Sequence, residues 1–261
     1  MNLEHITSEI ITLAKNVGGF IREERKTFSY DRVQHKGPSD LVSYVDMEAE
    51  KRLVERLQQL LPSAGFITEE GTTDQGQKEY TWIIDPLDGT TNFVHGLPNY
   101  CVSIGLMYEG RMVAGVVYEV ANNECFYAWK DGGAYLDGNR ITVSKSSSIA
   151  DVVLATGFPY YNFEKLDQYL KILNDLMKDT QGLRRMGSAA ADMAYVACGR
   201  YGGFFEYNLN SYDIAAGVIL VQEAGGTVTD FNGGDDFIFG REIVVGGHVH
   251  DEFLSVIKKY W

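Results

Sequence analysis

The sequence predicts a layered fold of helices and sheets, of the α/β or α+β class. Two observations predict it: two amphipathic helical patterns precede a run of short strands, and helical and strand patterns then alternate to the end of the chain. The 261 residues are 45% hydrophobic and 23% charged, which suits a globular protein with a core large enough to hold a buried site.

The first quarter of the chain predicts two helices joined by a loop. Apolar residues recur at three- and four-residue steps over residues 3–28, which predicts an amphipathic helix. Residues 30–42 are polar and contain glycine and proline, so we expect a loop there. A second helix is predicted over residues 43–61, with Ser43 as its N-cap and Pro62 just beyond its end.

A strand-rich stretch follows the second helix. Short β-rich runs bounded by turn signals predict strands at residues 66–68, 80–85, 101–108, 112–120, 124–129 and 141–143. The pair Asp137-Gly138 is typical of a hairpin turn. Residues 144–150 are mostly small and polar, and we expect them to mark an approximate boundary between two lobes of one domain that spans residues 1–261.

The second half alternates between the two periodicities. The pattern predicts strands at residues 152–156, 204–206, 228–230 and 243–246, and helices at residues 163–178, 189–197 and 212–224. Gly225-Gly226 suits a left-handed cap at the end of the last of these helices.

Charge and cysteine content exclude several classes of function. Lysine and arginine number 23 against 36 aspartates and glutamates, so the net charge is −13, which argues against a nucleic-acid binder or a protein of anionic membrane surfaces. No apolar stretch approaches the ~20 residues of a membrane span. The three cysteines lack metal-binding spacing, and the first residues do not resemble a signal peptide, so we expect reduced thiols in a cytoplasmic protein.

Two neighbouring carboxylates indicate a metal site. An apolar strand leads to Asp85, Pro86 and Gly89 favour a turn, and Asp88 follows on the same side of that turn. Carboxylates this close repel each other unless a cation lies between them. The backbone carbonyl of Leu87, which we expect to be exposed, adds a third hard oxygen. Such oxygens suit Mg²⁺ or Mn²⁺ rather than zinc.

Further acids could complete this site, although each has a purely structural alternative. Thr90 and Thr91 are placed to open a helix whose N-terminal amides can hold a phosphate oxygen. Glu69 follows a predicted strand and could equally belong to a solvated acidic loop. Asp46 and Asp213 each lie in the first turn of a predicted helix, where an acid also complements the helix dipole.

Four motifs, in order along almost the whole chain, resemble those of the inositol monophosphatase family of magnesium-dependent, lithium-sensitive phosphatases. The matching segments are residues 36–42 with Asp46, Glu69-Glu70, residues 85–93, and residues 212–217 continuing to 223–226. The resemblance implies a layered αβαβα fold and a homodimer. It also implies a small phosphorylated metabolite as the substrate, hydrolysed by direct attack of water without a covalent intermediate.

The resemblance also implies roles for individual residues. Two or three magnesium ions would be held by Glu69, Asp85, the Leu87 carbonyl, Asp88 and Asp213. The residues that would orient or deprotonate the metal-bound water are Asp46 and Thr90. Contacts to the phosphate would come from Gly89, Thr90 and Thr91, and contacts to the alcohol from Gly187, Ser188, Ala189 and Glu206.

The sequence departs from the family pattern at Tyr212, where the family usually has tryptophan. Asn210 and Ser211 precede it, so this departure leaves the choice of alcohol open. The candidates are inositol 1-phosphate, NADP, fructose 1,6-bisphosphate and 3′-phosphoadenosine 5′-phosphate. Arg184 and Arg185 could contact substrate or a second subunit, or form a solvated pair.

Two other classes of function compete with a phosphatase. One is a regulatory, protein-binding scaffold, because some members of the family contact RNA or transcription machinery; the net charge of −13 weighs against direct RNA binding. The other is a metal-dependent nuclease, which would need a basic groove that the sequence does not suggest.

Overall fold

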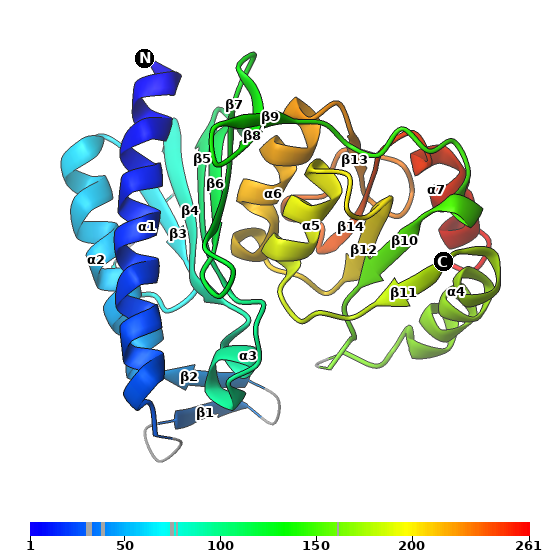
Figure 1. Cartoon of the computed structure of the whole chain (residues 1–261), viewed down its shortest axis with the longest axis horizontal. Coiled ribbons are helices and arrows are strands. Elements are labelled where there is room, and N and C mark those ends of the chain that lie inside the picture. The colour runs from blue at the N-terminus through cyan, green and yellow to red at the C-terminus, as the bar shows by residue number, and fades with distance from the viewer. Residues whose placement is uncertain (30–32, 38–39, 74–75, 77, 161) are drawn as a thin grey trace.

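Five layers make up the computed structural model, which describes residues 1–29, 33–37, 40–73, 76, 78–160 and 162–261 (Figure 1). Helices α1 (Leu3–Thr27) and α2 (Tyr44–Leu60) cover the outer face of a seven-stranded sheet. Helices α5 (Ala189–Ala197) and α6 (Ser211–Glu223) form the middle layer. A five-stranded sheet and helices α4 (Leu166–Asp179) and α7 (His250–Lys258) follow. This order confirms the predicted αβαβα fold.

The seven-stranded sheet keeps the order of the chain. Its strands are β3 (Gly65–Thr68), β4 (Tyr80–Asp88), β5 (Cys101–Tyr108), β6 (Arg111–Glu119), β7 (Glu124–Trp129), β8 (Gly133–Leu136) and β9 (Asn139–Ile141). Strands β3 and β4 are parallel, and every later neighbour is antiparallel. Because β3 and β4 run in the same direction, their carboxyl ends lie side by side and bring Glu69 close to Asp85.

The five-stranded sheet carries the substrate side of the predicted site. Its strands are, in spatial order, β11 (Gly182–Arg184), β10 (Val153–Thr156), β12 (Gly203–Tyr207), β14 (Glu242–Gly246) and β13 (Thr227–Thr229). The chain enters this sheet through residues 142–148, which form no helix or strand, and the short 3₁₀ helix η2 (Ile149–Asp151). Those residues include most of the expected lobe boundary, which stays a prediction.

Small residues let the middle layer approach the first sheet closely. A Cβ added at Gly105 would lie 3.1 Å from the Cβ of Ala215, and one at Gly115 would lie 2.8 Å from the carbonyl oxygen of Ala216. Any side chain at these two glycines would push α6 away from β5 and β6. This close contact holds the first turn of α6, with Asp213, against the seven-stranded sheet.

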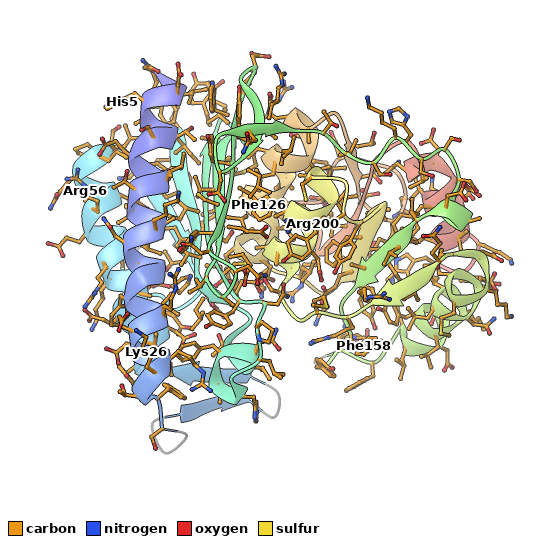
Figure 2. The ribbon with its side chains drawn as sticks, viewed as in Figure 1. His5, Lys26, Arg56, Phe126, Phe158 and Arg200 are labelled. Carbon is orange, nitrogen blue, oxygen red and sulfur yellow. The ribbon has the colours of Figure 1, made fainter. Side chains whose placement is uncertain are left out.

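A polar contact also fastens the middle layer to the first sheet. Arg200, just after α5, forms two hydrogen bonds to the carboxylate of Glu124 on β7. Its guanidinium lies 4.7 Å from the ring centre of Tyr195 and 5.8 Å from that of Phe126. Figure 2 shows Arg200 and Phe126 between the seven-stranded sheet and α5. The stacked, paired arginine stabilises the contact between the layers.

The prediction of a loop over residues 30–42 is wrong for the described part of this segment. Strands β1 (Val33–Gly37) and β2 (Asp40–Ser43) pair antiparallel there, whereas residues 30–32 and 38–39 lie outside the described residues. The two strands pair through backbone hydrogen bonds, which polar residues make as readily as apolar ones. Polarity alone was therefore a poor indicator of a loop.

Several other elements differ from their predictions. The last strand of the meander is β9 (Asn139–Ile141) rather than 141–143, and helix α4 starts at Leu166 rather than residue 163. Strand β11 and helix α7 were not predicted. The cap predictions are confirmed: Ser43 caps α2, and Gly225 adopts φ +84° after α6. None of the described helices is long and apolar enough to cross a membrane.

Candidate active site

A bulge in β4 places two carboxylates together. We expected this strand to end at Asp85 and the chain to turn at once, but β4 continues to Asp88. Asp85 pairs with Ser103 and Asp88 with Cys101, so β4 has one residue more than β5 over this stretch. Side chains three residues apart on a regular strand point to opposite faces, and the extra residue returns both carboxylates to one face.

The turn after β4 requires glycine. Gly89 adopts φ +95°, a left-handed conformation that side chains disfavour, and an added Cβ would lie 3.0 Å from the carbonyl oxygen of Asn99. Helix α3 (Thr90–His95) then begins, as predicted from Thr90 and Thr91. The side chain of Asn92 donates hydrogen bonds to the carbonyls of Asn99 and Met186, both at 2.8 Å, and so ties this turn to the segment before Gly187.

The acid cluster comes from three segments of the chain, the end of β3, β4 and α6, and its members are Glu69, Asp85, Asp88 and Asp213. Burial, followed by the charges of Glu69, Asp88 and Asp213, raises the pKa of Asp85 well above its ordinary value. Burial and Asp88 raise the pKa of Asp213 to about 7, against the opposing effects of the Asn210 amide and Arg241. Protonation would relieve this repulsion, and so would a cation.

Two of these carboxylates are also fixed by hydrogen bonds. Asp88 Oδ2 accepts from Ser188 Oγ at 2.6 Å and from the Ala190 amide at 2.7 Å. These bonds lower its pKa, but burial outweighs them and raises the value to about 6. Asp213 Oδ2 accepts from the Asn210 amide at 2.6 Å in a capping box at the start of α6.

The acid cluster has the oxygen donors of a magnesium site, but these donors do not lie close enough together to coordinate one ion. Among the residues that the structure describes, no three His, Cys, Asp or Glu side chains form a complete metal-binding group. Repulsion between carboxylates acts over longer distances than the ~2.1 Å of a magnesium–oxygen bond. The acids can therefore repel one another although they are not close enough to form a complete metal site. Buried carboxylates that repel one another are the donors that a hard cation stabilises.

A threonine and an aspartate form a second part of the site. Thr90 Oγ1 lies 2.8 Å from Asp46 Oδ1 and 3.0 Å from the carbonyl oxygen of Leu87. The other oxygen of Asp46 accepts from the amide and hydroxyl of Ser43 at 2.8 and 2.7 Å. Burial raises the pKa of Asp46 despite these bonds. The Leu87 residue is fully buried rather than exposed as expected, and its carbonyl already has Thr90 as a partner.

The predicted alcohol-binding residues line a small cavity beside the acids. This cavity has a volume of about 150 Å³, and its lining includes Asp88, Gly187, Ser188, Ala189, Glu206 and Asp213. Glu206 reaches it from β12, and burial, Asp213 and Asp192 raise its pKa well above the ordinary value, while Arg185 opposes them. Every predicted alcohol contact therefore lies next to the acid cluster.

Sequence reasoning missed two residues of this cavity. Asp192 lines it and had no predicted role, and Arg185, whose role was left open, lines it too. A charged residue in the apolar helix α5, one turn after Ser188, was the signal for Asp192. The guanidinium of Arg185 also lies 5.0 Å from the ring centre of Tyr160 and 5.7 Å from that of Phe158, two exposed aromatic residues. Phe158 is labelled in Figure 2.

A larger cleft adjoins the acids on the other side. It has a volume of about 720 Å³, and its lining includes Glu69, Asn208, Asn210, Tyr212, Asp213 and Arg241. Two of the residues that depart from or precede the family motif, Tyr212 and Asn210, thus face open space beside Asp213. Pro38 and Ser39 of the first motif lie outside the described residues.

The comparisons with known proteins agree with this geometry. The family model of the inositol monophosphatase family matches residues 2–261. The chain belongs to this family. It is 41% identical over 230 residues to a protein named inositol-1-monophosphatase from Mesorhizobium japonicum, covering 87% of this chain and 86% of the relative.

Other relatives of the same family carry a different name. The chain is 40% identical over 259 residues to a protein named Nus factor SuhB from Escherichia coli strain K12, covering 95% of this chain and 97% of the relative. The crystal structure of the extragenic suppressor protein SuhB from Bartonella henselae matches with a TM-score of 0.91 and 38% identity, covering 98% and 99% of the two chains. Membership of the family makes this protein a phosphoric monoester hydrolase.

Proposed function

We propose that this protein is a magnesium-dependent phosphomonoesterase that hydrolyses inositol 1-phosphate or a related ester by direct attack of water. The observation that carries the proposal is the cluster of Glu69, Asp85, Asp88 and Asp213, which lies beside the hydrogen-bonded pair of Thr90 and Asp46. Neither His nor Cys is needed as a nucleophile. Magnesium, when bound, polarises phosphoryl oxygens and makes water a stronger acid.

The donor set fits hard cations. We assign two or three ions to Glu69, Asp85, the Leu87 carbonyl, Asp88 and Asp213, with Mn²⁺ as a possible substitute. All five donors are oxygens, and the mutual repulsion of the carboxylates favours bound positive charge. The hydrogen bonds from Ser188 and Ala190 to Asp88 Oδ2 hold this carboxylate in one orientation, which pre-organises the set.

Thr90 and Asp46 are assigned to the attacking water. A hydroxyl that donates to a carboxylate keeps its own oxygen free to accept from water, so Thr90 can align the water and pass its proton toward Asp46. Burial raises the pKa of Asp46, which makes its carboxylate a better proton acceptor than that of an exposed aspartate. The two bonds from Ser43 to the second oxygen of Asp46 prevent the carboxylate from rotating away.

The remaining assignments place the substrate on both sides of the cluster. Gly89, Thr90 and Thr91 would contact the phosphate, because they stand at the turn between β4 and α3. Gly187, Ser188, Ala189 and Glu206 would contact the alcohol in the 150 Å³ cavity. The 720 Å³ cleft beside Tyr212 supports a broader specificity that extends to NADP, fructose 1,6-bisphosphate or 3′-phosphoadenosine 5′-phosphate.

A screen of phosphate release tests this function. Inositol, sugar and nucleotide monoesters are each incubated with the protein and Mg²⁺, with and without Li⁺. We expect release from at least inositol 1-phosphate and inhibition by Li⁺. Failure to release phosphate from every monoester in the presence of Mg²⁺ would refute the proposal.

A second candidate is a regulatory, protein-binding scaffold. The names of relatives 40% identical over nearly their whole length favour it, since those proteins are named Nus factor SuhB. If binding alone matters, an Asp85→Asn variant will support growth as well as the parent in a strain that lacks the protein. If catalysis matters, the variant will fail although the folded protein accumulates to the parental level.

A further inference from the structure

The small cavity contains a carboxyl group with no role so far. Asp192 lies on α5, and its residue is only 2% exposed. It lines the cavity together with Glu206 and Ser188. Its Oδ1 atom is buried and has no hydrogen-bond partner among the residues that the structure describes.

Two other buried acids, Glu50 and Asp46, have hydrogen-bond partners on both of their oxygens. Glu50 accepts hydrogen bonds from the amides of Glu70 and Thr72 at 2.7 and 2.8 Å. Asp46 has partners on both of its oxygens. A buried polar atom without a partner destabilises the fold, so such an atom calls for a function or a bound partner.

The surroundings of Asp192 point to a polar, uncharged partner. Burial and the charge of Asp88 raise its pKa well above the ordinary value, whereas Arg185 opposes them. The neutral acid is thereby favoured more than in an exposed aspartate, and it can both accept and donate hydrogen bonds. Glu206 belongs to the same cavity, and Asp192 is one of the charges that raise its pKa. Asp192 and Glu206 therefore add two carboxyl groups to a cavity that Asp88 and Asp213 of the acid cluster also line.

We propose that Asp192 binds a hydroxyl group of the substrate's alcohol, as a second hydrogen-bonding group beside Glu206. The site then selects esters of polyols, which offer at least two hydroxyls to the cavity, over phosphates of alcohols that lack any further hydroxyl. The inference deepens the proposed phosphatase function and rests on it. Asp192 would act on binding and selectivity, since the reacting phosphorus lies at the acid cluster.

The test compares an isosteric variant on two esters. Asp192→Asn keeps the shape of the side chain but changes its hydrogen-bonding pattern. With Mg²⁺, we expect KM for inositol 1-phosphate to rise about three- to tenfold, which is the fold-change of one net hydrogen bond. KM for phenyl phosphate and kcat for both esters should stay near parental values, and Tm should be unchanged or higher. Asp192→Ala repeats the test with no hydrogen-bonding side chain at this position.

A partnered carboxylate on the same lobe is the matched control. Asp175 accepts from Lys259 at 2.8 Å and from Tyr260 at 2.6 Å, and it is not among the residues that line the cavity. Asp175→Asn should lower Tm and leave both KM values unchanged. If Asp192 behaves in the same way, or if its replacement changes neither KM value, then it is structural or holds only a water molecule, and the proposal is wrong.

Calorimetry of inositol binding separates this inference from the proposed function. In the presence of Mg²⁺, the parent should bind inositol more tightly than Asp192→Asn by the same three- to tenfold. If the parent hydrolyses no ester but this difference in affinity remains, the phosphatase function fails and the hydroxyl site stands. If esters are hydrolysed and the affinities are equal, only the inference fails.

Discussion

Two acids of the seven-stranded sheet are both buried but have opposite surroundings. Glu119, at the end of β6, accepts from the amides of Ala121 and Asn122 at 3.1 and 2.5 Å. Asp85, near the end of β4, accepts from the Leu87 amide at 3.0 Å but otherwise faces acids. Burial raises the pKa of both, and then amides lower that of Glu119 while carboxylates raise that of Asp85 further.

The difference shows that a buried acid can stabilise a turn in one place and contribute to a reactive site in another. Amides that point at Glu119 fix a tight turn and offset part of the cost of burying its charge. The charge of Asp85 is not compensated by the chain, so either protonation or a bound cation must relieve it. Glu50 connects the two cases, because its bonds to the amides of Glu70 and Thr72 shape the loop that carries Glu69.

The largest expected effect comes from removing the uncompensated charge. Asp85→Asn should lower kcat/KM with Mg²⁺ by about 10³-fold or more, since several kcal/mol of transition-state stabilisation depend on the cation. The same change should raise Tm in EDTA, because it removes repulsion. In the parent, EDTA should abolish activity and Mg²⁺ should raise Tm by mass action. Full activity of the parent in metal-free buffer would show that the cluster holds no essential cation.

The pair of Thr90 and Asp46 should come next. Thr90→Ala should lower kcat about 10²- to 10⁴-fold and change KM little, because it removes the group that aligns the attacking water. Thr91→Ala, one residue away and exposed, should have the smaller effect and act mainly on KM. A phosphorylated form of the enzyme trapped from a quenched reaction would contradict direct attack by water.

The stability of the metal-free protein should depend on pH because of the clustered acids. Asp213 and Asp88 have folded-state pKa values of about 7 and about 6, above the ~3.9 of unfolded aspartate. The folded state therefore binds more protons between pH 4 and 7, so its stability should fall as the pH rises through this window. Saturating Mg²⁺ should flatten the slope of Tm against pH. If Asp213→Asn leaves the metal-free slope unchanged, the acids are not coupled as described.

A compensated acid should affect stability without affecting activity. Glu119→Gln removes the charge that two amides share, and we expect the free energy of unfolding to fall by about 1–3 kcal/mol. Its kcat/KM should match the parent below the unfolding temperature. Urea unfolding measures the stability, and the phosphate-release assay measures the activity. If Glu119→Gln loses activity while it is still folded, the comparison between Glu119 and Asp85 is wrong.

The layered fold and the pair of Asp85 and Asp88 could be predicted from local patterns, whereas the places of Glu69 and Asp213 in the cluster were implied only by the family resemblance. Periodicity located most of the helices, although not α7, and the spacing of Asp85 and Asp88 indicated that their carboxylates are close together. The bulge that returns both to one face could not be predicted, because it depends on the register between β4 and β5. The pairing of β1 with β2 was hidden by polar residues, and the lack of a partner for Asp192 appears only when α5 packs against the cavity.

The smallest expected effect concerns the choice of substrate. Tyr212 lines the 720 Å³ cleft beside Asp213, next to Asn210, so a smaller aromatic than the usual tryptophan leaves more room there. Tyr212→Trp should lower kcat/KM for the 2′-phosphate of NADP several-fold relative to inositol 1-phosphate, because the larger ring occupies space that only the bulky substrate uses. Arg241→Gln, at the same cleft, should leave the rate on inositol 1-phosphate near that of the parent. If the ratio of the two substrates is the same in the parent and Tyr212→Trp, the residue before Asp213 does not set selectivity. The cleft would then be a solvent-filled space beside the active site rather than a part of the substrate-binding site.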